Sequence, residues 1–176
     1  MRWIRGVSLS LLLLTAAAAQ EIKFPADLAS RATESVDVSL PGNMLQLASK
    51  FLSGSKPDEA QAKKLIANLK AIYVKAYEFD KPGQYSDADI ESVRAQVRGA
   101  PWTRILGAQS RKDGETAEIY IKSEKDVIDG LLIIAAEPKE LTFVHILGPI
   151  DPDQIANLSG KFGIPKLNLT PGRKKD

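Results

Sequence analysis

Few side chains in this sequence could carry out acid–base or nucleophilic chemistry. The chain has no cysteine, so thiol catalysis and thiolate metal sites are excluded. Its single histidine, His145, could act as a general base or as a zinc ligand. Because His145 alternates with Phe143 and Leu147 in an apolar stretch, we interpret it as a packing residue of a β-strand.

Carboxylates occur in two close pairs, Glu137/Glu140 and Asp151/Asp153. Two carboxyl groups can divide general-acid and general-base roles when their environments separate their pKa values. However, Glu137 and Glu140 flank a predicted turn, and Asp151 stands where a helix cap is expected. The sequence has no calcium-binding loop and neither of the common nucleotide-binding glycine motifs. We therefore predict no catalytic residues, no metal site and no cofactor.

A second group of side chains suits binding rather than catalysis. In two predicted strands, Ile72, Val74, Ile119 and Ile121 alternate with tyrosine and lysine, so the two kinds of side chain point to opposite faces of a sheet. We expect helices to cover the aliphatic face and to leave the other face open. The predicted binding residues on this open face are Tyr73, Lys75, Tyr77, Arg104, Tyr120 and Lys122. Such side chains can form a partner-binding surface, and they also suit a merely solvated sheet.

The element that must position these side chains is the segment from Val127 to Glu137. Leu131 to Ile134 are apolar without interruption, which is typical of an interior strand that is buried on both faces. The open face of the sheet must then be covered by a loop, by a second copy of the chain or by a partner. This requirement is the main physical reason to expect association.

The remaining elements follow from the same periodicities. Strands are predicted for 35–40, 71–79, 103–110, 117–122 and 141–147, and helices near 44–52, 58–69, 87–97 and after residue 151. In the 44–52 helix, one face carries Met44, Leu45, Ala48, Phe51 and Leu52. The order β-α-α-β-α-β-β-β-β-α indicates an α+β fold, with a mostly antiparallel sheet of five or six strands and helices packed on one face.

The beginning of the sequence predicts an export signal. Arg2 and Arg5 precede an apolar run that ends in Ala17–Ala19, the small residues that a signal peptidase recognises. We therefore predict a signal peptide over 1–19, a single domain over 25–163 and a disordered tail over 164–176. No later apolar run is long enough to span a membrane, so we expect an exported protein of the periplasm or the extracellular space.

The charge balance gives no reason to expect a nucleic-acid partner. The sequence has 24 basic and 22 acidic residues, and two of the arginines belong to the predicted signal. The exported chain is then close to neutral, whereas nucleic-acid-binding domains are usually basic.

Several segments together resemble a known bacterial family. They are the predicted signal peptide, Met44–Leu45, Tyr77–Phe79, Trp102, Asp129–Glu137, Glu140–Val144, Ile146 and Gly148–Asp151. Over about Leu28 to Leu158, the sequence resembles the family known as domain of unknown function 4252. The resemblance implies a small exported bacterial domain, often encoded near sigma factors of the extracytoplasmic type and their membrane-bound regulators. It implies no activity.

These observations favour a non-catalytic binding module of the cell envelope, with a link to extracytoplasmic sigma-factor signalling suggested by the resemblance alone. The expected partner is an envelope protein or a second copy of the chain. Two alternatives stay open: a small envelope hydrolase that uses carboxylates or His145, and a homodimeric structural protein.

Overall fold

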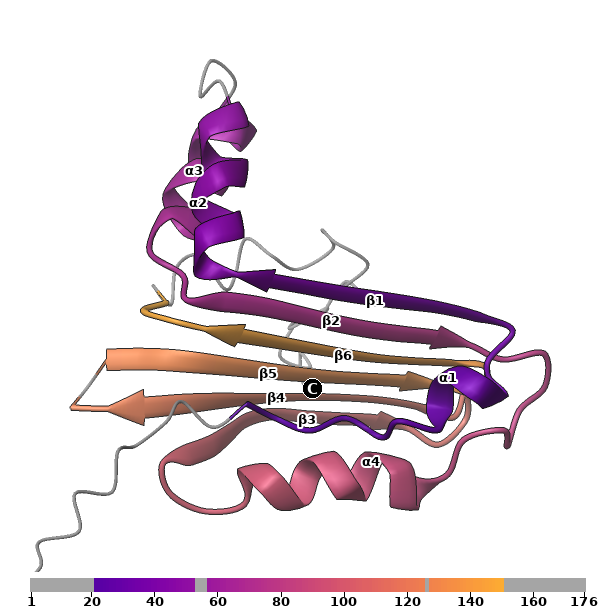
Figure 1. Ribbon diagram of the computed structural model, residues 1–176. Helices are drawn as coiled ribbons and strands as arrows, with labels where there is room; N and C mark the ends of the chain where they lie inside the picture. Colours follow the sequence, from indigo (N-terminus) through magenta and orange to yellow (C-terminus); the bar gives the residue numbers. More distant parts are fainter. Residues whose placement is uncertain (1–20, 53–56, 126, 151–176) are drawn as a thin grey trace, which may run out of the picture.

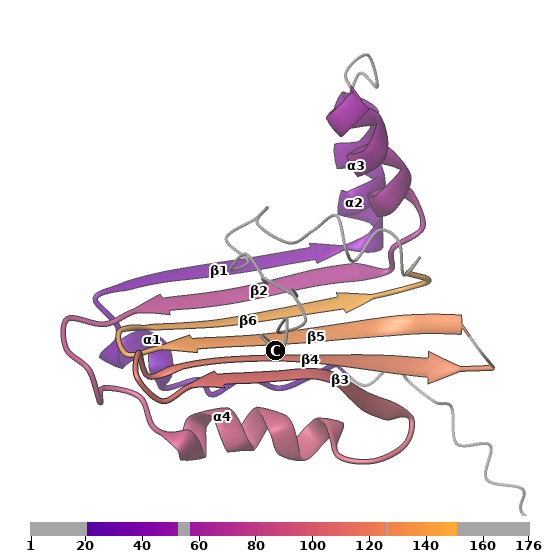
Figure 2. The same cartoon turned by 180° about the vertical axis from the view of Figure 1, so that it is seen from behind.

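The structure is a computed structural model that describes residues 21–52, 57–125 and 127–150. Its centre is a six-stranded antiparallel sheet with the strand order β1-β2-β6-β5-β4-β3. The strands are β1 (Glu34–Pro41), β2 (Ala71–Glu78), β3 (Trp102–Ser110), β4 (Glu115–Glu124), β5 (Val127–Glu137) and β6 (Glu140–Leu147). A sheet of this kind combined with helices is an α+β fold, as predicted (Figures 1 and 2).

The helices fall between the strands along the chain. They are α1 (Leu28–Arg31), α2 (Gly42–Phe51), α3 (Pro57–Ala67), α4 (Asp87–Arg94) and a 3-10 turn, η1 (Ala95–Val97). Helix α4 begins with a capping box, in which the Ser86 and Asp89 side chains each bond the other residue's backbone N–H. The serine and the acidic residue at this spacing predict this helix start from the sequence.

Strand β5 is an interior strand, as its apolar run predicts. It lies between β4 and β6, and the side chains of Leu131, Leu132 and Ile134 are fully buried. Neighbouring residues of β5 point to opposite faces, so each face of the sheet has its own apolar cluster. Burial of each of these side chains contributes roughly 1.5–3 kcal/mol before conformational entropy is subtracted.

We call the first of these faces the α4 face. It carries Leu132 and Phe143, which pack in one cluster with Leu28 of α1 and Ile90 and Val93 of α4. In Figure 1 the N-terminal segment and α1 pass in front of this face, while α4 runs beside β3.

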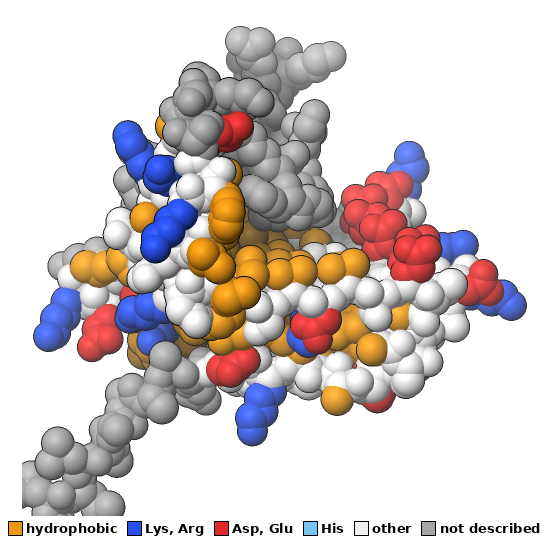
Figure 3. All heavy atoms as spheres, turned by 45° about the horizontal axis from the view of Figure 1, so that its top comes forward, with side chains coloured by type: hydrophobic (Ala, Val, Ile, Leu, Met, Phe, Trp, Pro, Cys, Tyr) orange, Lys and Arg blue, Asp and Glu red, His pale blue; other side chains and the backbone are white. Residues whose placement is uncertain are grey.

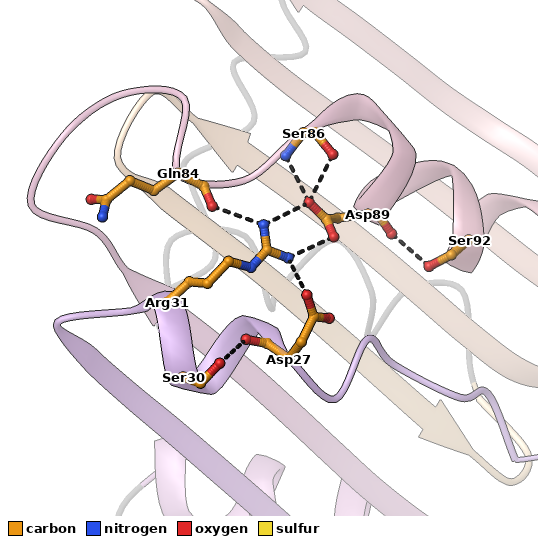
Figure 4. A network of polar contacts seen from close by, with 7 residues as sticks. All are labelled: Asp27, Ser30, Arg31, Gln84, Ser86, Asp89 and Ser92. Carbon is orange, nitrogen blue, oxygen red and sulfur yellow. Dashed lines mark hydrogen bonds and ion pairs between the residues drawn. The ribbon is translucent and has the colours of Figure 1, made fainter.

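Arg31 joins α1 to the start of α4 (Figure 4). Its Nη2 lies 2.7 Å from Oδ1 of Asp89, and its Nη1 lies 3.3 Å from Oδ2. Nη1 also donates a hydrogen bond to the carbonyl oxygen of Gln84 at 2.9 Å. One guanidinium group therefore holds α1, the loop before α4 and the first turn of α4 together.

The opposite face has different helical neighbours. Leu131, Ile133 and Val144 cluster there with Leu45 of α2 and with Leu69, which follows α3. The prediction that the helices pack on one face is therefore wrong. Helices α2 and α3 form a hairpin that projects past the β1 edge of the sheet, at the end where β1 finishes (Figures 1 and 2).

Several predicted segments lie outside the described residues. They are the signal peptide over 1–19, the helix after residue 151 and the tail over 164–176. The domain boundaries at 25 and 163 stay predictions. Among the described residues, no helix is long and apolar enough to cross a membrane.

Candidate binding surfaces

The six predicted binding residues share one face of the sheet, but that face is the α4 face. Tyr77 pairs across the strands with Leu141, and Tyr120 pairs with Leu132. Both tyrosines are 7% exposed, because the N-terminal segment and the helices cover the central strands on this side. The prediction of an open face is wrong for these two residues. Strand alternation shows which side chains share a face, but it does not show which face attracts the helices.

The N-terminal segment and the helices on the α4 face separate the predicted binding residues into three groups. Lys75 and Tyr77 line a groove near β1, and Arg104 lines a second groove near β3. Tyr73 and Lys122 lie beside His145. Binding of a partner by these side chains stays a prediction, but they cannot act as one continuous surface.

His145 is enclosed by aromatic rings. It is fully buried, with ring centroids 5.9 Å from Tyr73 and 6.0 Å from Trp102. Burial, together with a smaller contribution from the positive charge of Lys122, lowers the pKa of the imidazole to about 4. Among the described residues, neither ring nitrogen has a hydrogen-bond partner. The imidazole is therefore neutral near pH 7 and packs as an aromatic ring.

Only one of the two predicted carboxylate pairs lies within the described residues. Glu137 and Glu140 lie opposite each other at the β5–β6 turn, while Asp151 and Asp153 lie outside the described residues. Burial raises the pKa of Glu137, and the nearby carboxylates of Glu140 and Glu115 raise it further. Within the part of the chain that the structure describes, no group of three or more histidine or acidic side chains could hold a metal ion.

Within the described part of the chain, Glu118 is the most buried charged side chain. It is 5% exposed, and its two carboxylate oxygens share the single N–H of Arg94 Nε at 3.0 Å each, while Nη2 donates a second bond at 2.6 Å. The Tyr120 hydroxyl donates a further bond at 2.7 Å. Desolvation by itself would raise the pKa of Glu118, but the bonds from Arg94 and Tyr120 outweigh it, so the pKa lies below its usual value. The sequence indicates that Glu118 and Tyr120 share a face, but not that Arg94 of α4 reaches them.

A groove of about 570 Å³ adjoins this ion pair between α4 and the β3–β4 strands. Arg104 lies along it, and a Cβ at Gly107 would stand only 3.3 Å from the Arg104 Cζ. Arg94 already neutralises Glu118, and both Glu91 and Arg104 line the groove. The groove therefore offers charges of both signs and does not select one charged ligand.

The larger groove, of about 660 Å³, lies beside β1 on the α4 face. Ile22, Phe24 and Pro25 form the wall that belongs to the N-terminal segment. Lys75 and Asp37, which also line the groove, form an ion pair. Glu21 and Lys23 line the groove as well, so its lining combines apolar side chains with two acidic and two basic ones, of which Lys75 and Asp37 are paired.

The two outer strands of the sheet differ in regularity. Strand β1 pairs with β2 over eight consecutive residue pairs without a register shift. Strand β3 has a bulge between Arg104 and Leu106, where Ile105 is 52% exposed. A bulge twists an edge strand and hinders the addition of another strand. The edge of β1 has no such protection, and its Val36 is also 52% exposed.

The α2–α3 hairpin carries the third exposed feature. Met44, Leu47 and Phe51 of α2 are 47%, 47% and 81% exposed, and only Leu45 of this helix is buried. An apolar helical face suggests a core-facing helix, but most of this face points outward. In Figure 3, hydrophobic side chains gather along the hairpin and continue towards the sheet below it. We call Met44, Leu47 and Phe51 the α2 stripe.

Comparison with known proteins gives a family but no activity. Residues 30–158 match the family model described as Domain of unknown function (DUF4252). None of the curated proteins matches the chain.

Proposed function

We propose that this chain, which belongs to the DUF4252 family, is a binding module of the cell envelope. In this proposal it binds an extended segment of a partner protein along β1. The observation that carries the proposal is the regular outer edge of β1 beside the 660 Å³ groove. Addition of a strand to an open sheet edge is a common mode of peptide recognition.

The backbone of β1 supplies the affinity in this proposal. An outer strand of an antiparallel sheet directs alternate N–H and C=O groups away from its neighbour, where another chain can pair with them. Six of the eight β1 residues are exposed, so this edge is accessible. Pro41 has no N–H group, and it sets the limit of pairing at the end of the strand.

The groove supplies the selectivity. Side chains of an added strand alternate between the two faces of the sheet, so every second one faces the α4 side. There the segment meets Phe24, Pro25 and Tyr77, beside the compensated Lys75–Asp37 pair. An apolar side chain at that position replaces water without separating Lys75 from Asp37. We therefore expect an extended segment with an apolar residue at every second position.

The envelope location is part of the same proposal. It rests on the export signal predicted over 1–19. The first partners to test are the membrane-bound regulators of extracytoplasmic sigma factors that the family resemblance implies.

Selection from a peptide library, followed by hydrogen exchange of the complex, tests the proposal. We expect the selected peptides to slow exchange of the backbone amides in 34–41 and to leave those of β3 unchanged. Protection confined to another part of the chain would refute binding at β1.

Two neighbouring substitutions provide a matched pair of variants. Of Val36→Pro and Asp37→Pro, one removes an N–H that points outward, and the other removes an N–H that pairs with β2. The variant that keeps the melting temperature should lose peptide binding, because its lost donor is the one that faces the ligand. Equal binding by that variant would contradict the proposal. Light scattering of the protein without peptide shows whether a second copy occupies the same edge.

A further inference from the structure

The α2 stripe is not part of the β1 groove, and its composition points to a different contact. Its residues are spaced three and four apart, so they lie on one side of α2. An outward-facing apolar stripe on a helix that buries only Leu45 contributes little to the core. Contiguous apolar side chains on a protein surface mark a site of interaction with another protein or with a membrane.

The basic residues of the hairpin lie on both helices, whereas its two acidic residues, Asp58 and Glu59, lie at the start of α3. Helix α2 contains no acidic residue, and Lys50 directly precedes Phe51 in its last turn. Lys63 of α3 is near the same end of the hairpin, because its Nζ lies 3.4 Å from the carbonyl oxygen of Leu52. Lys64 is also exposed. Phe51, the most exposed apolar side chain of the stripe, is therefore accompanied by basic side chains.

These charges distinguish between two possible occupants. A second copy packed on the stripe would bring two α2 helices together, each with Lys50 and no acidic residue, and the repulsion between these lysines would oppose the contact. An anionic lipid surface would attract the same lysines while the apolar side chains enter the boundary between headgroups and acyl chains. The charge pattern therefore favours the lipid surface.

The position of the hairpin also suits a flat surface. It projects past the β1 edge of the sheet, and Phe51 ends α2 at the far end of that projection (Figure 1). In Figure 3, basic side chains lie near the hydrophobic ones on the hairpin, and an acidic side chain lies near its tip. The hairpin can therefore touch a surface without contact from the broad faces of the sheet.

We propose that the α2–α3 hairpin binds the surface of an anionic membrane, with Phe51 and Leu47 inserted among the lipids and with Lys50 and Lys63 beside their phosphate groups. This contact holds the module at a membrane and leaves its sheet free of the lipid. It does not depend on the function proposed for β1, which is tested by peptide binding in the absence of lipid.

Vesicle co-sedimentation tests this proposal with the chain that begins at Gln20, which retains every described residue. Vesicles of phosphatidylcholine that contain phosphatidylglycerol should bind the protein, and vesicles of phosphatidylcholine alone should bind it at least about fivefold more weakly. The Phe51→Ser variant should bind the anionic vesicles about tenfold more weakly. Lys50→Gln should weaken binding to the anionic vesicles only.

Matched controls come from apolar residues with similar exposure elsewhere. Ile105 and Val127 are 52% and 51% exposed and lie on β3 and β5, three or more strands away from β1 in the sheet order, so Ile105→Ser and Val127→Ser should bind vesicles as the parent chain does. Equal loss in these controls, or no binding to either kind of vesicle, would overturn the proposal. Sedimentation velocity gives a further check, because a dimer that Phe51→Ser dissociates would assign the stripe to a second copy instead.

Discussion

Replacement of Arg94 by methionine tests the energetic role of the most buried charge. The change keeps most of the aliphatic stem but removes the guanidinium that binds Glu118 through Nε and Nη2. Glu118 would then remain as a 5% exposed carboxylate whose only described hydrogen-bond partner is Tyr120. Loss of one partner of a buried ion pair costs roughly 3–5 kcal/mol. Because the Arg94 side chain is 23% exposed, water can partly replace it, and we expect a loss of about 2–3 kcal/mol.

Urea denaturation measures this loss as a shift of the unfolding midpoint at an unchanged slope. Arg98→Met is a suitable control, because the Arg98 side chain is 70% exposed and pairs with Glu91 at the surface. That control should alter the free energy of unfolding by no more than about 0.5 kcal/mol. In a Glu118→Gln background, Arg94→Met should cost less, because no charge is then left buried.

The pH dependence gives a second readout of the same reasoning. In the parent chain the folded-state pKa of Glu118 is lowered, so this carboxylate stabilises the fold above its unfolded pKa, and the stabilisation is lost as the pH falls through the folded pKa. Without Arg94, burial raises the folded-state pKa of Glu118, so protonation of Glu118 at low pH removes the cost of an unpaired buried carboxylate. The deficit of Arg94→Met should therefore shrink between about pH 7 and about pH 4.5. A deficit that equals that of Arg98→Met, or that does not change with pH, would refute this account.

Three further changes test other parts of the fold. Asp89→Asn should lower the free energy of unfolding by about 1–2 kcal/mol near pH 7, because it removes the charged bond to Arg31. The difference between variant and parent should vanish as the pH falls through the lowered pKa of Asp89, because protonation then removes the same bond from the parent. Circular dichroism in urea at several pH values measures this difference. The free energy of unfolding of the parent chain should fall by roughly 3 kcal/mol between about pH 6.5 and about pH 4, because His145 takes up a proton more readily in the unfolded state. The His145→Phe variant should lack this dependence on pH. An unchanged pH dependence in the variant would contradict a buried, neutral imidazole. Gly148→Ala should destabilise the fold by about 1–3 kcal/mol, because Gly148 has a φ of +122° and a Cβ there would lie 2.8 Å from the Lys70 backbone nitrogen; a melting temperature equal to that of the parent would show that the β6 end can move away.

The candidate site could be predicted only in part. The sequence places Tyr77, Lys75 and Tyr120 on one face, because strand alternation is local. It does not show that α4 covers Tyr120, or that the N-terminal segment and β1 form a groove around Lys75 and Tyr77. The Arg94–Glu118 pair also needs the tertiary structure, because its two residues lie 24 positions apart, on a helix and on a strand.

The sequence by itself determined most of the elements in this protein. The uninterrupted apolar run of Leu131 to Ile134 predicts an interior strand, and Ser86 with Asp89 predicts the start of α4, since both depend on the chemistry of neighbouring residues. Tertiary structure alone decided which apolar faces are buried. The periodicity of α2 suggests a core-facing helix, yet Phe51 is 81% exposed, because the hairpin leaves the sheet at the end of β1. The periodicity of a sequence indicates that a helix has an apolar side. The path of the whole chain determines what that side contacts.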